Sequence, residues 1–224
     1  MKLFCFPWSG GNGSFFYRYR KELDEDLELV PMDPVYSEDT PFREVVLALT
    51  EKVKESLENG EKFLLFGHSM GACLAYEVGR CLSEQTDRGQ FGMVLSGMLP
   101  PDRELFAKLD SDGDSKRIAF HQKNLGMETT PKLPELLMEA LVKKMNGDLR
   151  LLKRYESCSE TKPSGPVTVI YSEQEDRKGA PTDWKDRFTG DVKAVHVSGK
   201  HFFLIEDFSA VGKEINEIKR RLEE

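Results

Sequence analysis

Long hydrophobic runs are missing from this chain of 224 residues. No segment approaches the roughly 18 consecutive apolar residues that a membrane-spanning helix needs. The stretch from Met1 to Pro7 is also too short to be the apolar part of a signal peptide, because a cluster of glycines follows it. The sequence therefore predicts a cytoplasmic protein that does not enter or bind a membrane.

Cysteine is scarce, and positive charge is in the minority. The four cysteines have no C-x-x-C spacing, so we expect buried, reduced thiols and neither a disulfide framework nor a metal site: Cys5, Cys73, Cys81 and Cys158. The 39 Asp and Glu residues outnumber the 32 Lys and Arg residues, and the net charge is −7. This balance argues against non-specific binding to nucleic acid. The length is typical of a single domain, residues 1–224, and we expect a monomer.

Short apolar runs alternate with helical patterns along most of the chain. This order predicts an α/β fold in which helices flank both faces of a mostly parallel sheet. The predicted strands are Leu3 to Phe6, Leu27 to Met32, Phe63 to Phe66, Met93 to Ser96, Val167 to Tyr171 and Val192 to Val197. The predicted helices are Ser14 to Leu23, Thr40 to Leu57, Ser69 to Ser83 and Asp207 to Leu222.

The alternation stops over residues 100–162. Helical pieces are predicted there at Lys116 to Leu125, Pro134 to Met145 and Asp148 to Tyr155. Sixty residues are too many for a plain connection in a compact domain. We therefore expect a helical lid, inserted over the functional edge of the sheet.

The pentapeptide from Gly67 to Gly71 reads Gly-His-Ser-Met-Gly and joins a predicted strand to a predicted helix. In that setting G-x-S-x-G is typical of a nucleophile elbow, the strained turn that presents the serine of an α/β-hydrolase. Ser69 is the candidate nucleophile. The N–H of Met70 lies at the start of the helix, where it can stabilise a developing oxyanion.

A serine hydroxyl needs a base, and the chain has four histidines. His201 follows the last predicted strand, which is where a hydrolase with the chain order Ser, acid, His keeps its base. His68 lies inside the elbow, and its side chain should point elsewhere. His121 falls in the expected lid and His196 in the last strand.

The acid that orients the histidine is expected in the loop after the strand Val167 to Tyr171. Asp176 is our choice there, and Glu173 and Glu175 compete with it. Some hydrolases of this type carry the acid after the strand that follows the elbow. Only Asp102 could compete from that side.

The loop after the first strand reads Pro-Trp-Ser-Gly-Gly-Asn-Gly-Ser from Pro7 to Ser14, and its small residues let backbone N–H groups approach a ligand. We assign the second oxyanion donor to the N–H of Ser9, with that of Gly10 as the alternative. Trp8, Gly10 and Phe202 are expected to contact the substrate. The loop lacks the G-x-x-x-x-G-K-[ST] pattern, which argues against a nucleotide site.

With these residues assembled, the sequence resembles the type II thioesterases, the free-standing editing enzymes of nonribosomal peptide and polyketide synthesis. The segment from Phe6 to Gly11 is similar to that family's F-P-[aromatic or His]-A-G-G. Phe66 to Gly71 matches its F-G-H-S-M-G, and Gly199 to Leu204 is similar to its G-G-H-F-F-L. Asp148 and Tyr155 give weaker matches.

The chain also departs from the family in two loops. Ser172 and Arg177 stand where the family's acid loop, G-x-x-D-P, has Gly and Pro, and Asp33 to Tyr36 replaces its P-G-R or P-G-H.

The resemblance implies an α/β-hydrolase fold and a substrate held as a thioester on the 4′-phosphopantetheine arm of an acyl or peptidyl carrier protein. It implies a Ser69, Asp176 and His201 triad that requires no metal or cofactor. Because carrier proteins are acidic, a local basic patch would have to dock them, and the candidates around the lid are Lys143, Lys144, Arg150, Lys153 and Arg154.

Three other functions fit the same motifs. G-x-S-x-G does not distinguish an ester from a thioester, so a general carboxylesterase or lipase stays open. An acyltransferase would use the same triad with an alcohol or amine in place of water. A carrier-binding module that lost catalysis is the third alternative.

Overall fold

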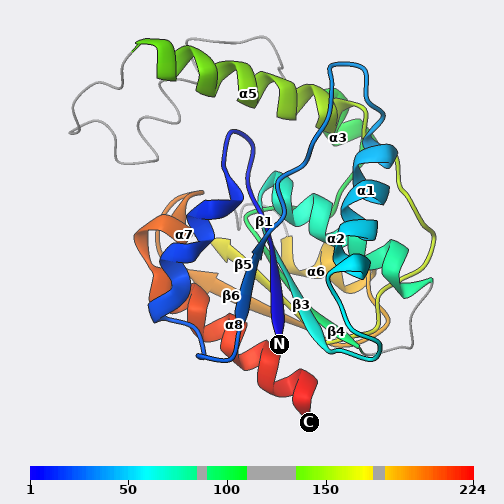
Figure 1. Ribbon diagram of the computed structural model, residues 1–224, viewed down its shortest axis with the longest axis vertical. Helices are drawn as coiled ribbons and strands as arrows, with labels where there is room; N and C mark the ends of the chain where they lie inside the picture. The colour runs from blue at the N-terminus through cyan, green and yellow to red at the C-terminus, as the bar shows by residue number, and fades with distance from the viewer. Residues whose placement is uncertain (85–89, 110–134, 174–179) are drawn as a thin grey trace.

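Six parallel strands form one sheet, as the sequence predicts (Figure 1). The computed structural model describes residues 1–84, 90–109, 135–173 and 180–224, and the strand order in these residues is β2-β1-β3-β4-β5-β6. All six predicted strands are confirmed, with ends that differ by at most two residues. They are β1 (Lys2–Phe6), β2 (Glu28–Pro31), β3 (Phe63–His68), β4 (Phe91–Ser96), β5 (Val167–Ser172) and β6 (Val192–Val197).

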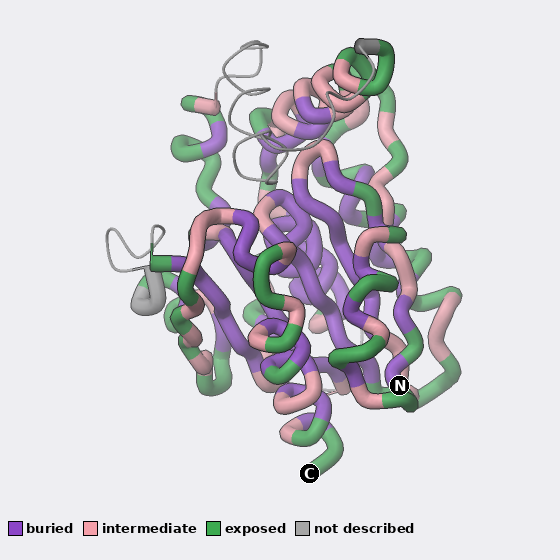
Figure 2. The backbone as a smooth tube through the Cα atoms, turned by 90° about the vertical axis from the view of Figure 1, so that its left-hand side faces the viewer, coloured by how far each residue is buried: buried purple, intermediate pink, exposed green. Residues whose placement is uncertain are grey.

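Helices cover both faces of the sheet. Successive side chains of a strand point to opposite faces, and in the central strands both sets of side chains are apolar. In β1, Phe4 and Phe6 pack on one face while Leu3 and Cys5 pack on the other. The first face carries α1 (Phe42–Glu55), α2 (Met70–Ser83) and α6 (Ala180–Lys185). The second carries η1 (Gly13–Lys21), α7 (Phe203–Glu206) and α8 (Phe208–Glu223). Figure 2 shows the strands as a buried layer between these helices.

The predicted helix at Ser14 to Leu23 is a 3-10 helix, η1, and not an α-helix. Its buried residues are Gly13, Phe16 and Tyr19, which are three apart. A 3-10 helix has three residues per turn, so this spacing places all of them on one side, facing the sheet. By contrast, α8 is an α-helix as predicted, and it buries Val211, Ile215 and Ile218.

The lid region contributes α3 (Arg103–Ala107) and α5 (Glu135–Lys153), and α5 lies across the end of the molecule toward which the strands run (Figure 1). The sequence predicts two helices, Pro134 to Met145 and Asp148 to Tyr155, but the chain continues through Gly147 as one helix. A glycine inside a helix costs only about 1 kcal/mol, which packing on both sides of it can offset. The predicted piece Lys116 to Leu125 lies outside the described residues.

All four cysteines are buried and free, as predicted. Among the helices that the structure describes, none combines the length and the apolar character that crossing a membrane requires.

Candidate active site

Ser69 stands in a sharp turn between β3 and α2. Its φ of 53° is the only positive value of a non-glycine residue in the described part of the chain. The two flanking glycines allow the turn because a Cβ on Gly67 would lie 2.1 Å from the carbonyl oxygen of Gly71. A Cβ on Gly71 would lie 2.0 Å from the carbonyl oxygen of Phe6 in β1. This is the strained geometry of a nucleophile elbow.

The backbone around Ser69 is held by neighbouring groups. Its N–H donates to the carbonyl oxygen of Ser96 at the end of β4, at 2.8 Å, and its own carbonyl accepts from the N–H of Ala72 at 2.9 Å. Met70 is the first residue of α2, so its N–H has no acceptor within the helix. That N–H is therefore available for an oxyanion beside Ser69.

The loop after β1 forms a tight turn from Trp8 to Gly11, closed by a 2.8 Å hydrogen bond from the N–H of Gly11 to the carbonyl of Trp8. Gly10 has a φ of 79°, the value that a type II turn requires at its third position. Its N–H donates to Asp148 at 2.6 Å. Of the two predicted oxyanion donors, the N–H of Ser9 is therefore favoured over that of Gly10.

His201 lies in the loop between β6 and α7, half-buried beside the elbow. Its ring centroid is 5.0 Å from that of His68, the residue directly before Ser69. The loop thus returns from the far strand β6 to the middle of the sheet. The structure brings the predicted base and the predicted nucleophile into one neighbourhood.

His68 points into the protein, as expected. Its ring is completely buried, and its Nδ1 lies 2.8 Å from the hydroxyl of Ser96. Burial, and secondarily the nearby His201, lowers the pKa of His68 well below its usual range. A neutral imidazole therefore packs beneath His201, a contact that the sequence did not predict.

The acid is the least described part of the site, because Asp176 and Glu175 lie outside the described residues, as does His121. Glu173 is exposed at the end of β5. Asp102 uses its carboxylate to cap α3, where it accepts from the N–H of Leu105 at 2.9 Å. The choice of Asp176 stays a prediction.

Trp8 and Phe202 belong to a buried aromatic cluster beside the elbow. Their ring centroids are 5.8 Å apart, and Trp8 also contacts the ring of His68 at 6.2 Å. Both side chains are almost fully buried. Their contact with substrate, like that of Gly10, stays a prediction.

The sequence did not assign a role to Asp148, which the structure places against the loop after β1. Besides accepting from Gly10, this fully buried carboxylate accepts from Tyr36 and from Lys144. These partners are 138, 112 and 4 residues away along the chain. The only available signal was the weak match of Asp148 to the family pattern.

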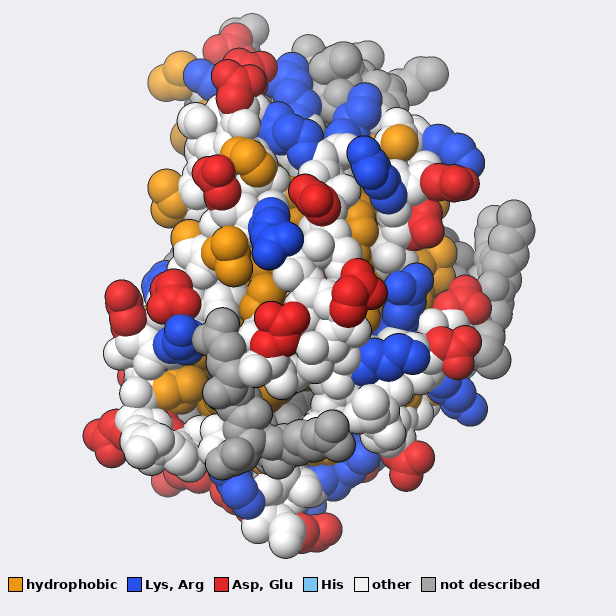
Figure 3. Space-filling view, turned by 90° about the vertical axis from the view of Figure 1, so that its right-hand side faces the viewer, with side chains coloured by type: hydrophobic (Ala, Val, Ile, Leu, Met, Phe, Trp, Pro, Cys, Tyr) orange, Lys and Arg blue, Asp and Glu red, His pale blue; other side chains and the backbone are white. Residues whose placement is uncertain are grey.

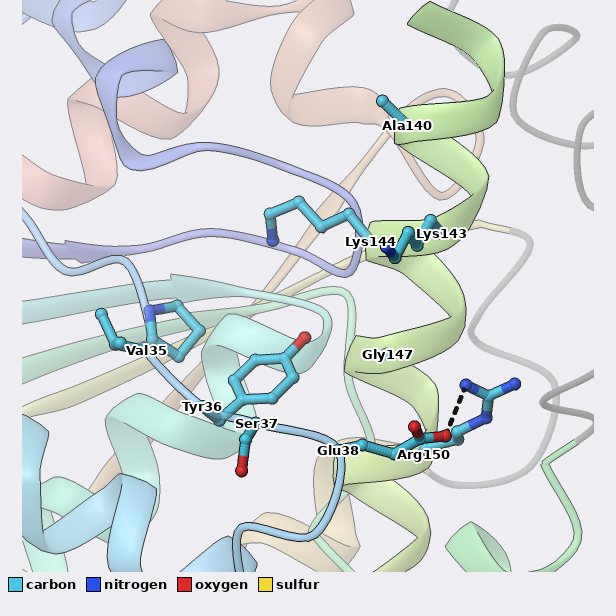
Figure 4. A pocket seen from close by; sticks show the side chains of 10 residues that line it. Val35, Tyr36, Ser37, Glu38, Ala140, Lys143, Lys144, Gly147 and Arg150 are labelled. Atoms are coloured by element: carbon cyan, nitrogen blue, oxygen red, sulfur yellow. Dashed lines mark hydrogen bonds and ion pairs between the residues drawn. The ribbon is translucent and has the colours of Figure 1, made fainter. Parts of the chain in front are cut away.

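Lys and Arg side chains gather near the end of the molecule where α5 lies (Figure 3). Lys143, Lys144 and Arg150 line a cavity of about 570 Å³ between α5 and the loop at residues 34–38. Figure 4 shows Arg150 paired with Glu38, at 3.3 Å, and Lys144 pairs with Asp148 at 3.0 Å. Part of the predicted basic patch is thus neutralised within the protein.

Together, a parallel sheet, a strained serine between a strand and a helix, and a histidine brought beside it define a hydrolase of the α/β-hydrolase fold. The family model of the thioesterase domain matches residues 1–219. The chain belongs to this thioesterase family.

Individual relatives agree with this result. Thioesterase PikA5 of Streptomyces venezuelae is 25% identical over 231 residues, which cover 97% of this chain and 80% of that protein. The medium-chain S-acyl fatty acid synthase thioesterase of Anas platyrhynchos is 27% identical over 224 residues, covering 92% of this chain and 86% of that protein. The crystal structure of ClbQ, from the colibactin NRPS/PKS pathway, superposes with a TM-score of 0.78 at 21% identity. That match covers 99% of this chain and 98% of ClbQ, and it shows the shared fold.

Proposed function

We propose that this protein is a type II thioesterase. It hydrolyses acyl, aminoacyl or small peptidyl thioesters on the 4′-phosphopantetheine arm of carrier proteins. The observation that carries the proposal is the elbow, with Ser69 at a φ of 53° and His201 beside it. The thioesterase family of the chain and its likeness to ClbQ of an NRPS/PKS pathway support the substrate class.

The proposed reaction has two halves. The hydroxyl of Ser69 attacks the thioester carbonyl while His201 takes its proton, and the thiol leaves with that proton when the tetrahedral intermediate collapses. Water then attacks the acyl-serine with His201 as base, which releases the acid and restores Ser69. Asp176 stabilises the imidazolium. No metal or cofactor is required by this chemistry.

Two backbone donors would hold the oxyanion of each intermediate, the N–H groups of Met70 and Ser9. A donor of this kind is typically worth about 3 kcal/mol of transition-state stabilisation. The two residues follow neighbouring strands, since Phe6 of β1 pairs with Gly67 of β3. Their proximity therefore follows from the order of the strands.

Carrier docking is assigned to the basic side of α5, where Lys143 lines the cavity beside Lys144 and Arg150, whose charges are already paired with Asp148 and Glu38. With a net charge of −7, general attraction between this protein and an acidic carrier is unfavourable. Recognition must therefore come from a local patch. We propose a monomer that acts in the cytoplasm, without nucleic acid or membrane partners.

The deciding experiment measures release of acetyl, aminoacyl and longer acyl groups from a loaded carrier protein, by wild type and by Ser69→Ala. The same groups on free thiol mimics and on p-nitrophenyl esters are the matched substrates. We expect the carrier-bound thioester to be preferred, and turnover to fall by about 10⁶-fold in Ser69→Ala. Fast ester cleavage without any gain from the carrier would show a general esterase. The absence of Ser69-dependent turnover would favour the binding module.

The acid is tested by neutralising each candidate in turn. Asp176→Asn should lower kcat by about 10⁴-fold, because the histidine loses the group that fixes its tautomer. Glu173→Gln, Glu175→Gln and Asp102→Asn are the matched controls and should keep activity within about threefold of wild type. A large loss in a control together with a mild one in Asp176→Asn would reassign the acid.

A further inference from the structure

Asp148 joins three separate parts of the chain although its side chain is completely buried. From α5, its Oδ2 accepts from the N–H of Gly10 at 2.6 Å and from Nζ of Lys144 at 3.0 Å. Its Oδ1 accepts from the hydroxyl of Tyr36 in the loop after β2. Figure 4 shows the side chain of Lys144 extending from α5 and the ring of Tyr36 on the loop that faces this helix. A buried carboxylate is tolerated only with such partners.

Tyr36 keeps its proton. Burial, reinforced by the charge of Asp148, raises the pKa of Tyr36, so its hydroxyl donates to the carboxylate at any physiological pH. The ammonium of Lys144 supplies the compensating charge and is partly exposed. The third donor is the N–H of Gly10, which lies in the same turn as the proposed oxyanion donor, the N–H of Ser9.

That turn is fixed at two of its peptide groups. The carbonyl of Trp8 accepts from Gly11, and in a trans peptide the N–H of Ser9 points opposite to that carbonyl. The next peptide group is held through the N–H of Gly10 by Asp148. The hydroxyl of Ser9 also donates to the carbonyl of Met145 on α5, at 3.3 Å. The direction of the Ser9 N–H thus depends on contacts with α5.

We infer that Asp148 is a positioning residue: from the lid helix, it holds the Trp8 to Gly11 turn so that the N–H of Ser9 faces the oxyanion. This role rests on the proposed function of the site. Asp148 itself contacts neither the substrate nor Ser69. Its effect should therefore appear in transition-state binding and not in substrate binding.

The test compares Asp148→Leu and Asp148→Ala with Asp148→Asn. Leu keeps the branched shape of Asp with two methyl groups in place of the oxygens and removes every acceptor, whereas the amide oxygen of Asn can still accept from Gly10. We expect Leu and Ala to lower kcat by about 10²-fold with KM within about threefold of wild type. Asn should restore activity to within about tenfold of wild type. Tyr36→Phe is the control that breaks another contact of Asp148 and leaves the bond to Gly10 in place.

Two readouts separate positioning from a merely structural role. A trifluoromethyl ketone forms a tetrahedral adduct with Ser69, so its Ki should rise in proportion to the loss of kcat/KM across the variants. Amide hydrogen exchange of residues 7–13 should accelerate in Asp148→Leu, because the N–H of Gly10 loses its acceptor. Thermal melts confirm that each variant is folded at the assay temperature. Asp148→Leu is kept as the test if Asp148→Ala does not fold.

The inference is overturned if folded Asp148→Leu keeps kcat and the ketone affinity within about threefold of wild type. It is also overturned if kcat falls while the ketone still binds normally. Kinetics on p-nitrophenyl esters run in parallel with the thioesters. Cleavage of the esters without turnover of the carrier-bound thioester would reject the proposed substrate class. The effect of the Asp148 substitutions would then still be measured on the esters. A wild type inert to substrates and ketone alike would reject both proposals.

Discussion

Two glycines decide whether Ser69 can adopt its backbone conformation. A Cβ at position 67 or 71 would meet backbone carbonyl oxygens, and neither oxygen can move without displacing a strand or a helix. We predict that Gly67→Ala lowers the free energy of unfolding by at least about 3 kcal/mol and abolishes turnover. Urea denaturation and acyl release measure the two effects.

Gly60→Ala is the matched control for this substitution. Gly60 has a positive φ, 78°, which Gly67 does not, and no atom lies within 4 Å of its added Cβ. It should cost about 1 kcal/mol of backbone strain and leave turnover unchanged. Equal losses of stability and turnover in the two variants would contradict the argument that close packing of the elbow excludes a side chain at position 67.

The buried ring of His68 makes stability depend on pH. Its pKa is depressed in the folded protein, so on acidification the unfolded chain binds a proton that the folded chain does not. The free energy of unfolding should therefore fall as pH drops below 6.5, the usual histidine value, by at most about 1.4 kcal/mol per pH unit for this group. Urea titrations between pH 7.5 and about 5 measure the slope. His68→Gln should flatten it, and an unchanged slope would exclude His68 as its source.

At the residue scale, the sequence was informative wherever the site is built from neighbours in the chain. The elbow and its Met70 donor occupy five consecutive residues, and His201 is identified as the base by its position after the last strand. Asp148, Tyr36 and Ser96 could not be found in this way. Their partners lie 138, 112 and 28 residues away, and no local pattern encodes such distant contacts.

At the scale of helices and strands, α2 anchors the segment that follows α5. Glu77 on α2 is fully buried and accepts from the hydroxyl of Tyr155 at 2.8 Å, from the N–H of Cys158 at 2.9 Å and from Arg80 at 3.2 Å. The helix that directly follows Ser69 thus holds the end of the lid segment. The position of α5 over the site depends on this carboxylate.

Removing Glu77 should be costly, because the buried Arg80 would lose its ion-pair partner and the hydroxyl of Tyr155 would lose its acceptor. We predict that Glu77→Ala lowers the free energy of unfolding by about 3–5 kcal/mol in urea denaturation. The control is Glu51→Ala, which breaks an exposed pair with Lys54 and should change stability by less than about 0.5 kcal/mol. A loss below about 1 kcal/mol in Glu77→Ala would contradict the anchoring role.

Strands were predicted more reliably than helices, for a physical reason. A strand of a parallel sheet is buried on both faces and reads as an unbroken apolar run, such as Phe63 to Phe66. Helices depend more on their surroundings: η1 has the spacing of a 3-10 helix, and α5 continues through Gly147. The short helices α3 and α6 contain too few residues to show a period.

For the whole molecule, the burial of all four thiols gives a simple chemical test. Burial raises the pKa of Cys5 and of Cys73 well above the usual range, so neither forms the reactive thiolate. We predict that an aromatic disulfide reagent labels fewer than about one thiol per folded chain within minutes. In denaturant it should label all four. Rapid labelling of the native protein would show that part of the core opens readily.

The last helix, α8, covers part of one face of the sheet, and its position in the chain affects how the protein folds during synthesis. On the second face, α8 packs against β4 and β5, and its Val211, Ile215 and Ile218 share one buried cluster with Val94 and Ile170 of those strands. In chain order α8 follows all six strands, so a growing polypeptide carries this apolar surface uncovered until synthesis reaches α8. Ser69 is therefore translated early but gains its working geometry late, and a chain stalled in between would be a natural substrate for chaperones.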